Sequence, residues 1–347
     1  MRNDSNNMPR VISRPNTLKS RLRPKDIPAG VIGLGLMGTS IVACLLAAGH
    51  PVVAITRSVL KHRNTKRHVL ALLRELVRED LLQRDPSQLI QGLIISENYS
   101  DLSNREFVVE SIIESIEAKY EVLRKIEEVV SHQALIGSNT SAIPVTELQK
   151  GARHPERILG LHWAEPAHVT RFMEIICGKH TEPAFADRAL ALARGWGKEP
   201  SLLRRDIRGF ITNRIMYAML REAFYLVESG YATIADVDRS LRNDLGYWIT
   251  FAGPFRFMDL TGIPAYEAVM RDLFPELCND TKVPNLISRA VQLGARGVSN
   301  AKGFYSYTPA QAKRWEKRFL KFTYEIRALA QKYPEEVEPF FVTTEQG

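Results

Sequence analysis

Short apolar runs alternate with helical patterns from residue 28 to about residue 205. The runs are VIG at 31–33, HPVVAIT at 50–56, LIIS at 93–96, FVVESI at 107–112, ALIGSN at 134–139 and ILGLHWA at 158–164. Runs this short, separated by helical stretches, are typical of strands in a parallel α/β sheet. We therefore predict a doubly wound α/β domain in this part of the chain.

After about residue 205 the pattern becomes helical throughout. RIMYAMLREAFYLVESG places its apolar side chains on one helical face and ends at Gly230, a residue that suits the position just after a helix. Thr233 and Asp236 have the spacing of a capping box, and Thr308 followed by Pro309 and Gln311 opens a long final helix. The predicted organisation is a disordered basic arm at 1–27, the α/β domain at 28–205, an all-α C-terminal domain at 206–335 and a tail at 336–347.

Composition and cysteine usage limit the class of protein. With 347 residues, 45% hydrophobic, the chain can bury a core in each of two domains. No apolar run is long enough for a membrane span, and the N-terminus lacks a signal peptide's apolar segment. The cysteines Cys44, Cys177 and Cys278 lie far apart, so neither a disulfide framework nor a zinc site is predicted. We expect a soluble protein of a reducing cytoplasm, with no metal and no membrane contact.

The net charge of +8 comes partly from the N-terminal arm and from LKHRNTKRH at 60–68. Such a charge attracts phosphorylated ligands or nucleic acid. No nucleic-acid-binding motif is present, so we expect no nucleic-acid partner and favour a phosphorylated small molecule.

A glycine motif follows the first predicted strand. Gly33, Gly35 and Gly38 form the pattern GxGxxG between a short strand and an apolar helix. The missing side chains permit a tight turn and let a pyrophosphate approach the backbone N–H groups at the helix N-terminus. This context predicts a Rossmann-type dinucleotide site for a nicotinamide or a flavin, rather than a merely structural turn. The predicted cofactor loop also contains Leu34, Leu36 and Met37.

The end of the second strand bears on the choice of cofactor. NAD sites usually place Asp or Glu there, but this chain has Thr56, Arg57 and Ser58. A guanidinium between two hydroxyls suits a 2′-phosphate better than a bare ribose. The sequence therefore predicts NAD(P) with NADP favoured over NAD. The alternative is that Arg57 stacks on adenine or is solvated.

The segment GLHWAEPAHVTRFMEIICG carries one ionisable residue in each of two apolar runs. His162 and Glu174 are symmetric about His168, so a hairpin-like return would place them opposite each other on antiparallel strands. The carboxylate would fix the imidazole tautomer, and the other ring nitrogen could take a proton from a substrate hydroxyl. A purely structural His–Glu pair is the alternative. The position after a strand, near a dinucleotide, favours catalysis.

The chain resembles the 3-hydroxyacyl-CoA dehydrogenase family over nearly its whole length. The matching motifs are VIGLGLMG, ESIIESIEAKYEVLRKI, SNTSAIPVTEL, PERILGLHWAEP, FMEII, RGFITNR, AGPFRFMDLTG and AKGFYSY. The resemblance implies that His162 is the general base and that Glu174 orients it. It also implies that Ser141 bonds the reacting oxygen and that Asn213 helps to place the substrate.

On the cofactor side, the resemblance assigns Glu114, Lys119 and Lys302 to the neighbourhood of the nicotinamide ribose. It further implies that the C-terminal helices close over the substrate and form a homodimer interface. Without the resemblance, Ser141 and Asn213 would be read as helix caps and Lys119 as a solvated partner of Glu114.

Two positions depart from the family pattern. Glu165 stands where the family usually has Asn in HxxNP, which replaces an amide by an acceptor-only carboxylate near His162. It could raise the pKa of His162 or receive a cationic substrate group. DLGYWITFAGP has the longer spacing of the branch that resembles λ-crystallin, L-gulonate dehydrogenase and carnitine dehydrogenase, but Trp248 stands where that branch often has Arg.

Three functions follow from these residues. The first is NAD(P)-dependent oxidation of the secondary hydroxyl of a 3-hydroxyacyl-CoA or a small 3-hydroxy acid, or the reverse. The second is a 6-phosphogluconate-type β-hydroxyacid dehydrogenase, which would need a catalytic lysine in the place of His162. The third is a non-catalytic, crystallin-like cofactor-binding protein, which the intact site residues argue against.

Overall fold

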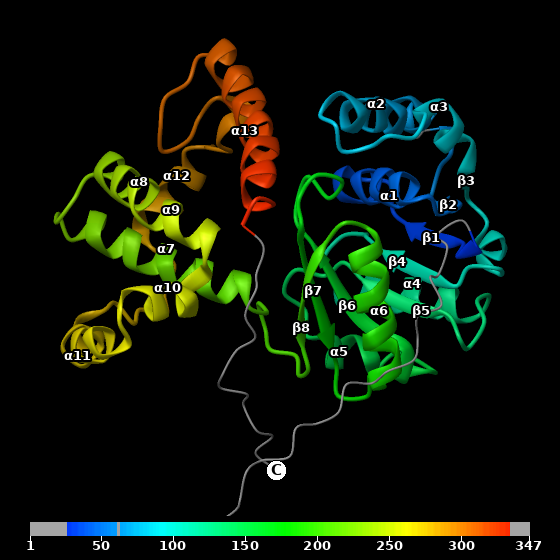
Figure 1. Cartoon of the computed structure of the whole chain (residues 1–347), viewed down its shortest axis with the longest axis horizontal. Coiled ribbons are helices and arrows are strands. Elements are labelled where there is room, and N and C mark those ends of the chain that lie inside the picture. The colour runs from blue at the N-terminus through cyan, green and yellow to red at the C-terminus, as the bar shows by residue number, and fades with distance from the viewer. Residues whose placement is uncertain (1–25, 61–62, 334–347) are drawn as a thin grey trace, which may run out of the picture.

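The computed structural model describes residues 26–60 and 63–333 as a sheet-containing domain followed by helices (Figure 1). The sheet has eight strands in the order β3-β2-β1-β4-β5-β6-β7-β8. All neighbours are parallel except β6 and β7, which are antiparallel. The strands are β1 (Ala29–Ile32), β2 (Val52–Ile55), β3 (Leu93–Ser96), β4 (Phe107–Glu110), β5 (Leu135–Ser138), β6 (Ile158–Trp163), β7 (Phe172–Cys177) and β8 (Glu199–Leu203).

Helices cover both faces of the sheet, as a doubly wound fold requires. The helices of this domain are α1 (Leu36–Ala48), α2 (Thr65–Arg78), α3 (Pro86–Leu89), α4 (Ile116–Glu127), α5 (Val145–Gln149) and α6 (Pro183–Gly195). Side chains of α1, α2, α3 and α6 pack in one core cluster with one set of strand residues. Side chains of α4 and α5 pack in a second cluster with the alternate set. The predicted α/β architecture is therefore confirmed.

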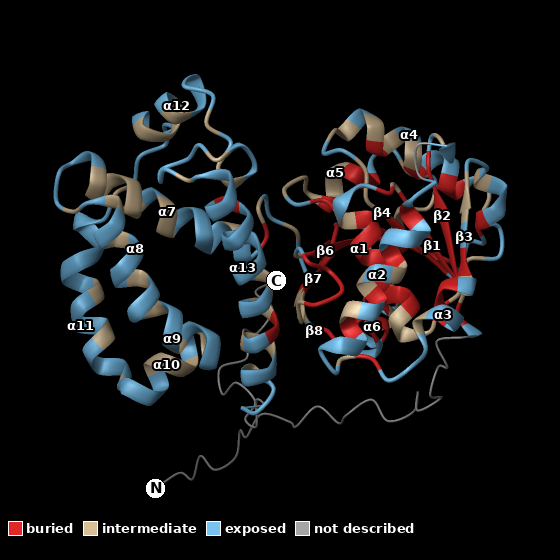
Figure 2. Ribbon diagram, turned by 90° about the horizontal axis from the view of Figure 1, so that it is seen from above, coloured by how far each residue is buried: buried red, intermediate tan, exposed pale blue. Residues whose placement is uncertain are grey.

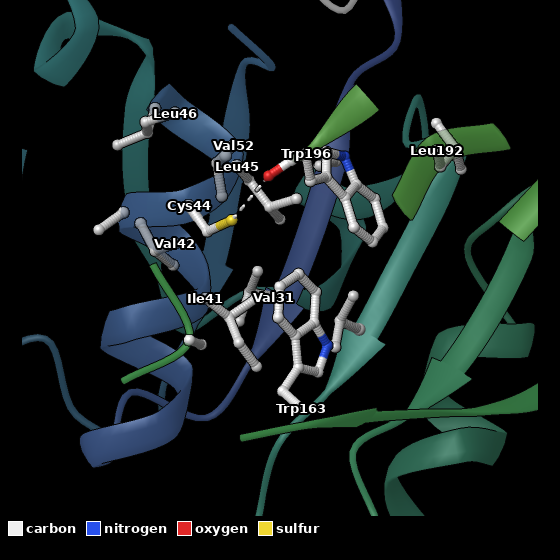
Figure 3. Close-up of a cluster of buried hydrophobic side chains, with 14 of the residues drawn as sticks. Val31, Ile41, Val42, Cys44, Leu45, Leu46, Val52, Trp163, Leu192 and Trp196 are labelled. Carbon is white, nitrogen blue, oxygen red and sulfur yellow. Dashed lines mark hydrogen bonds between the residues drawn. The ribbon is translucent and has the colours of Figure 1, made fainter. Parts of the chain in front are cut away.

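The larger core holds the strand that carries His162. In this cluster the indole of Trp163 stacks on that of Trp196, with ring centroids 5.2 Å apart (Figure 3). The Cys44 thiol of α1 contacts the backbone carbonyl of Trp196 (Figure 3). Trp163 is thus fixed in the apolar interior. Because successive side chains of a strand point to opposite faces, His162 points to the other face of β6.

The helical part begins at α7 (Thr212–Glu228) and continues with α8 (Ile234–Asn243), α9 (Leu245–Phe251), α10 (Gly253–Thr261), α11 (Ile263–Leu273), α12 (Asn285–Gln292) and α13 (Pro309–Ala330). Gly230 lies after α7 with φ 77°, as predicted. Thr233 begins α8 by accepting a hydrogen bond from the backbone N–H of Asp236, and Thr308 and Gln311 form the predicted capping box of α13.

Burial separates the two parts of the molecule (Figure 2). The buried hydrophobic side chains lie in the sheet domain, at Phe210, and at Ala312 and Tyr324 of α13. None of the residues of α7–α12 is buried. Among the described residues, no helix is long and apolar enough to span a membrane. The predicted arm and tail lie outside these residues, apart from 26–27.

Candidate active site

The glycine loop has the backbone geometry that a pyrophosphate needs. Gly33 has φ 95°, and a side chain there would meet the Ser111 carbonyl oxygen at 2.4 Å. A side chain on Gly38 would lie 1.9 Å from the Gly33 carbonyl oxygen, whereas the Cβ position of Gly35 is open. No side chain caps the N-terminus of α1. The first N–H groups of α1 therefore have no side-chain cap, and the loop fits a dinucleotide phosphate.

The end of β2 presents the residues predicted to select the cofactor. Thr56 is buried and its Oγ1 accepts a hydrogen bond from the Ser58 backbone N–H at 3.4 Å, while Arg57 is exposed. Sequence reasoning missed Glu97, whose Oε1 accepts a hydrogen bond from the Val59 backbone N–H at 2.7 Å. Its position directly after β3, beside β2 in the sheet, was the available signal. An acid thus lies beside the turn that carries Arg57.

His162 and Glu174 form a hydrogen-bonded pair. They are direct partners in the register of β6 and β7, as the symmetry about His168 predicted. His162 Nδ1 lies 2.8 Å from Glu174 Oε2. Since Nδ1 is engaged, Nε2 is the ring nitrogen left for a substrate. The imidazole packs against the rings of Phe172 and Phe210, each with its centroid 5.5 Å away.

Glu174 also ties the base to the start of α7. Its Oε1 accepts hydrogen bonds from the backbone N–H groups of Ile211 and Thr212 at 3.0 and 2.9 Å. Burial raises the pKa of Glu174, but the hydrogen bonds from His162 and these N–H groups outweigh it and lower the pKa below its ordinary value. The carboxylate therefore stays ionised at neutral pH. It can orient the imidazole and stabilise its protonated form.

Ser141 and Asn213 meet beside this pair. Asn213 donates from Nδ2 to the Ser141 carbonyl at 2.9 Å. The loop of Ser141 is also held by Glu114, whose Oε1 accepts hydrogen bonds from Thr140 Oγ1 and from the backbone N–H groups of Ser141 and Ala142. The Ser141 residue is exposed, so its hydroxyl is available to a ligand.

Lys119 lies inside an ion-pair network beneath this loop. Its ammonium is fully buried, 2.9 Å from both carboxylate oxygens of Glu110 and 3.4 Å from Glu114. Ser138 also donates to Glu110 at 2.5 Å. Glu114 is the partner of Lys119 that reaches the surface, with 38% of its side chain exposed. Sequence reasoning missed Glu110, although a Glu ending the buried run FVVE was the available signal.

Glu165 lies in the loop that follows β6. Burial raises the pKa of Glu165, against hydrogen bonds from the Ala167 backbone and Ser40 that lower it. Ser40 of α1 also contacts His168 Nδ1 at 2.8 Å, and burial, followed by the charge of Lys198, lowers the pKa of His168 to about 4. The loop therefore places a carboxyl group and a neutral imidazole against the helix that follows the glycine loop.

Two predicted site residues lie elsewhere in the described part of the chain. Trp248 of α9 stacks on Phe257 of α10 with ring centroids 4.4 Å apart. Lys302 lies in a turn in which its backbone pairs with Gly297 and Ser306. No hydrogen bond or ion pair joins either side chain to His162 or to the glycine loop within residues 26–60 and 63–333.

The sheet and the glycine loop define a Rossmann-type dinucleotide-binding domain, and a hydrogen-bonded His–Glu pair lies in the same sheet. Residues 28–207 match the NAD binding domain of 3-hydroxyacyl-CoA dehydrogenase, and residues 209–307 match its C-terminal domain. The chain belongs to the 3-hydroxyacyl-CoA dehydrogenase family, and it is an oxidoreductase acting on CH–OH donors. This membership decides against the 6-phosphogluconate-type alternative.

Curated relatives differ in their substrates. The chain is 32% identical over 284 residues to 5-formyl-3-hydroxy-2-methylpyridine 4-carboxylate 5-dehydrogenase of Mesorhizobium japonicum, covering 82% of this chain and 91% of that protein. It is 29% identical over 281 residues to 3-hydroxybutyryl-CoA dehydrogenase of Mycobacterium tuberculosis, covering 80% of this chain and 97% of that protein.

Solved structures show the same two kinds of relative. A crystal structure of the pyridine carboxylate dehydrogenase, described as an NAD⁺-dependent dismutase, matches with a TM-score of 0.82 at 28% identity, covering 88% of this chain and 99% of that one. The (S)-3-hydroxybutyryl-CoA dehydrogenase of Ralstonia eutropha matches with a TM-score of 0.67 at 27% identity, covering 81% and 99%.

Proposed function

We propose that the protein oxidises the secondary hydroxyl of a 3-hydroxyacyl-CoA or a small 3-hydroxy acid to the 3-oxo compound, or runs the reverse reaction, with His162 as general base. The contact of 2.8 Å between His162 Nδ1 and Glu174 Oε2 carries this proposal. It leaves Nε2 of His162 for the substrate and supplies a carboxylate that stabilises the imidazolium.

The reaction removes one proton and one hydride from the substrate, and different groups receive them. When bound, the nicotinamide supplies the acceptor for the hydride that leaves the hydroxyl-bearing carbon. His162 Nε2 takes the hydroxyl proton as the hydride leaves, so the product is a neutral carbonyl and the charge lies on an imidazolium paired with Glu174. The exposed Ser141 hydroxyl donates to the reacting oxygen, and Asn213 fixes the loop of Ser141 through the Ser141 carbonyl.

A small carboxylate is a second candidate substrate. The Mesorhizobium relative, by its name, acts on a pyridine carboxylate rather than a thioester. A solved structure of a dehydrogenase of this kind matches with a TM-score of 0.82. Glu165 in this chain offers a carboxyl group to a cationic or protonated ring nitrogen. An aromatic hydroxy or formyl carboxylate therefore belongs among the compounds to be tested.

For the cofactor we favour NADP over NAD. Arg57 is exposed beside two hydroxyl residues, Thr56 and Ser58, and β2 ends without an acid. A 2′-phosphate would gain a charge-assisted contact from the guanidinium. The carboxylate of Glu97, which is held at the backbone of Val59, opposes this preference.

We also propose a homodimer formed through the helical domain. Large apolar side chains of α7, α9 and α10 are strongly exposed, including Ile215 at 61%, Tyr247 at 73% and Phe255 at 78%. Folding cannot be stabilised by apolar surface that stays in water. A second copy of the same domain would cover these faces by symmetry.

The test is reduction of NAD and NADP by the purified full-length chain. Matched substrates are 3-hydroxybutyryl-CoA, free 3-hydroxybutyrate and hydroxymethyl- and formyl-pyridine carboxylates, each followed by the absorbance of the reduced cofactor. Turnover of a 3-hydroxy compound supports the main proposal. Turnover of the pyridine compounds alone would replace it, and cofactor binding without turnover of any compound would overturn both substrate proposals.

A further inference from the structure

Two cationic side chains converge on the backbone of the loop between β6 and β7. This loop, residues 164–171, begins two residues after His162 and carries Glu165. Lys198 donates from Nζ to the carbonyl oxygens of Ala167, at 2.5 Å, and of Thr170. Arg327 donates from Nη1 to the carbonyl oxygen of Val169. Three carbonyls of the loop are thus held by positive charge.

Lys198 is an unusual residue to bury. It is 4% exposed, between α6 and β8, and its ammonium lies 5.1 Å from the centre of a Trp163 ring. Burial lowers its pKa. Among the described residues it has no carboxylate partner, so the two loop carbonyls and the indole face replace water around the ammonium. The buried ammonium of Lys198 therefore requires the loop carbonyls as acceptors, and the same hydrogen bonds hold those carbonyls in place.

Arg327 reaches the same loop from the other end of the chain. It belongs to the last turn of α13, beyond residues 209–307 that match the family's C-terminal domain. The hydroxyl of Tyr324, one turn earlier, contacts Glu75 Oε1 of α2 at 2.9 Å. Both views place α13 between the other helices and the sheet domain (Figures 1 and 2). The final helix therefore spans from the helical domain to the loop of Glu165.

The loop has few bonds of its own that fix its direction. The backbone N–H groups of Val169 and Thr170 donate to the Pro166 carbonyl, and Thr170 Oγ1 donates to the Ala164 carbonyl. These bonds close the turn, but they do not anchor it to the rest of the domain. Several contacts provide that anchor. Ala167 and Val169 pack in the larger core cluster, and the Arg171 carbonyl accepts a hydrogen bond from the Glu199 backbone N–H at 2.8 Å. Ser40 bonds His168, and the two cations hold the carbonyls between these points.

We propose that Lys198 and Arg327 are positioning residues, which hold loop 164–171 so that Glu165 faces the substrate beside His162. Because Arg327 belongs to α13, the packing of α13 against the sheet domain also sets the position of Glu165 in the substrate site. The inference rests on the proposed function of His162 and Glu165.

Arg327→Ala tests this directly, with Arg327→Lys as the conservative variant and Arg318→Ala as the matched control. Arg318 lies on the same helix and is exposed. We expect Arg327→Ala to raise the substrate KM on the order of tenfold, the scale of one lost charge-assisted hydrogen bond. NAD(P)H affinity and kcat should change little. Arg327→Lys should restore part of the loss, and Arg318→Ala should match the wild type.

Hydrogen–deuterium exchange separates this inference from the proposed function. In Arg327→Ala the amides of 164–171 should exchange faster, while those of β1 and α1 stay as in the wild type. Unchanged exchange in the loop together with an unchanged KM would overturn the inference. A uniform rise across the sheet domain would also overturn it, because the role would then be general stability. If the wild type oxidises no compound, the proposed function fails, and the exchange result still decides whether Arg327 holds the loop.

Discussion

Asn213 donates a hydrogen bond of 2.9 Å to the backbone carbonyl of Ser141, although 72 residues separate them in the chain. This bond joins the first turn of α7 to the loop that follows β5. Glu174 holds the same turn of α7 through the Thr212 N–H and also holds His162. The proposed base, the proposed oxyanion donor and the helix between them therefore form one connected structure, in which a single substitution affects several groups.

His162→Ala should cut turnover by roughly 100-fold or more, the scale of a positioned general base. Cofactor affinity should stay nearly intact, because His162 is paired with Glu174 and not with the glycine loop. Steady-state kinetics and NAD(P)H titration measure the two effects. His180→Ala, at an exposed position, serves as the control. Near-normal turnover in His162→Ala would remove this residue from the mechanism.

Glu174→Gln should lower turnover, since a neutral amide cannot stabilise the developing imidazolium. It should also change how stability depends on pH. The folded pKa of Glu174 lies below the ordinary value of 4.5, so its ionised form stabilises the fold above that value. This contribution is lost as pH falls through the folded pKa. The difference in unfolding free energy between wild type and variant should be largest near neutrality and shrink in acid. A difference that grows on acidification would contradict the assignment.

Glu165→Asn restores the amide that the family usually carries at this position. If the carboxyl group meets a cationic substrate group, the variant should lose activity on pyridine carboxylates and gain it on 3-hydroxyacyl compounds. The ratio of the two kcat/KM values measures this shift. Glu316→Asn, on the exposed face of α13, should leave the ratio unchanged. The same substrate ranking in Glu165→Asn and wild type would place Glu165 outside the reacting pocket.

Arg57→Ala should remove most of the preference for NADP. A charge-assisted phosphate contact is worth about 1.5 to 3 kcal/mol, which corresponds to about 10- to 100-fold in affinity. Thr56→Asp should turn the preference toward NAD, because the new carboxylate would repel a 2′-phosphate. Dissociation constants for NADPH and NADH at one ionic strength decide the matter. Arg74→Ala is the control on α2, and tighter NADH binding by the wild type would show that Arg57 does not meet the phosphate.

Phe255→Asp should weaken or abolish the proposed homodimer, since it places a charge on a strongly exposed apolar face of α10. Sedimentation velocity over a range of concentrations measures the effect. Val77→Asp, at a partly exposed apolar position of α2, should leave the oligomeric state unchanged. A monomeric wild type at all concentrations would refute the homodimer and leave the exposed helices to another partner.

The sequence by itself determined the elements and the local pairing. The strands from 31 to 164, the start of α13 at Thr308 and the facing of His162 and Glu174 follow from apolar period, capping chemistry and symmetry about a turn. These features depend on residues close together in the chain. The strand β8 was missed because EPSLL contains a proline and only two strongly apolar residues. This segment forms a strand because it pairs with β7, which would otherwise be the edge of the sheet.

Only the tertiary structure decided which distant groups meet. By its spacing alone Lys119 is read as a solvated surface charge, but in the fold it is buried against Glu110 at the end of β4. Lys198 and Arg327 reach one loop from positions 129 residues apart in the chain, a meeting that no local pattern encodes. The physical reason is that a buried cation requires acceptors from whatever backbone lies next to it. That neighbour is set by the packing of whole elements and not by sequence spacing.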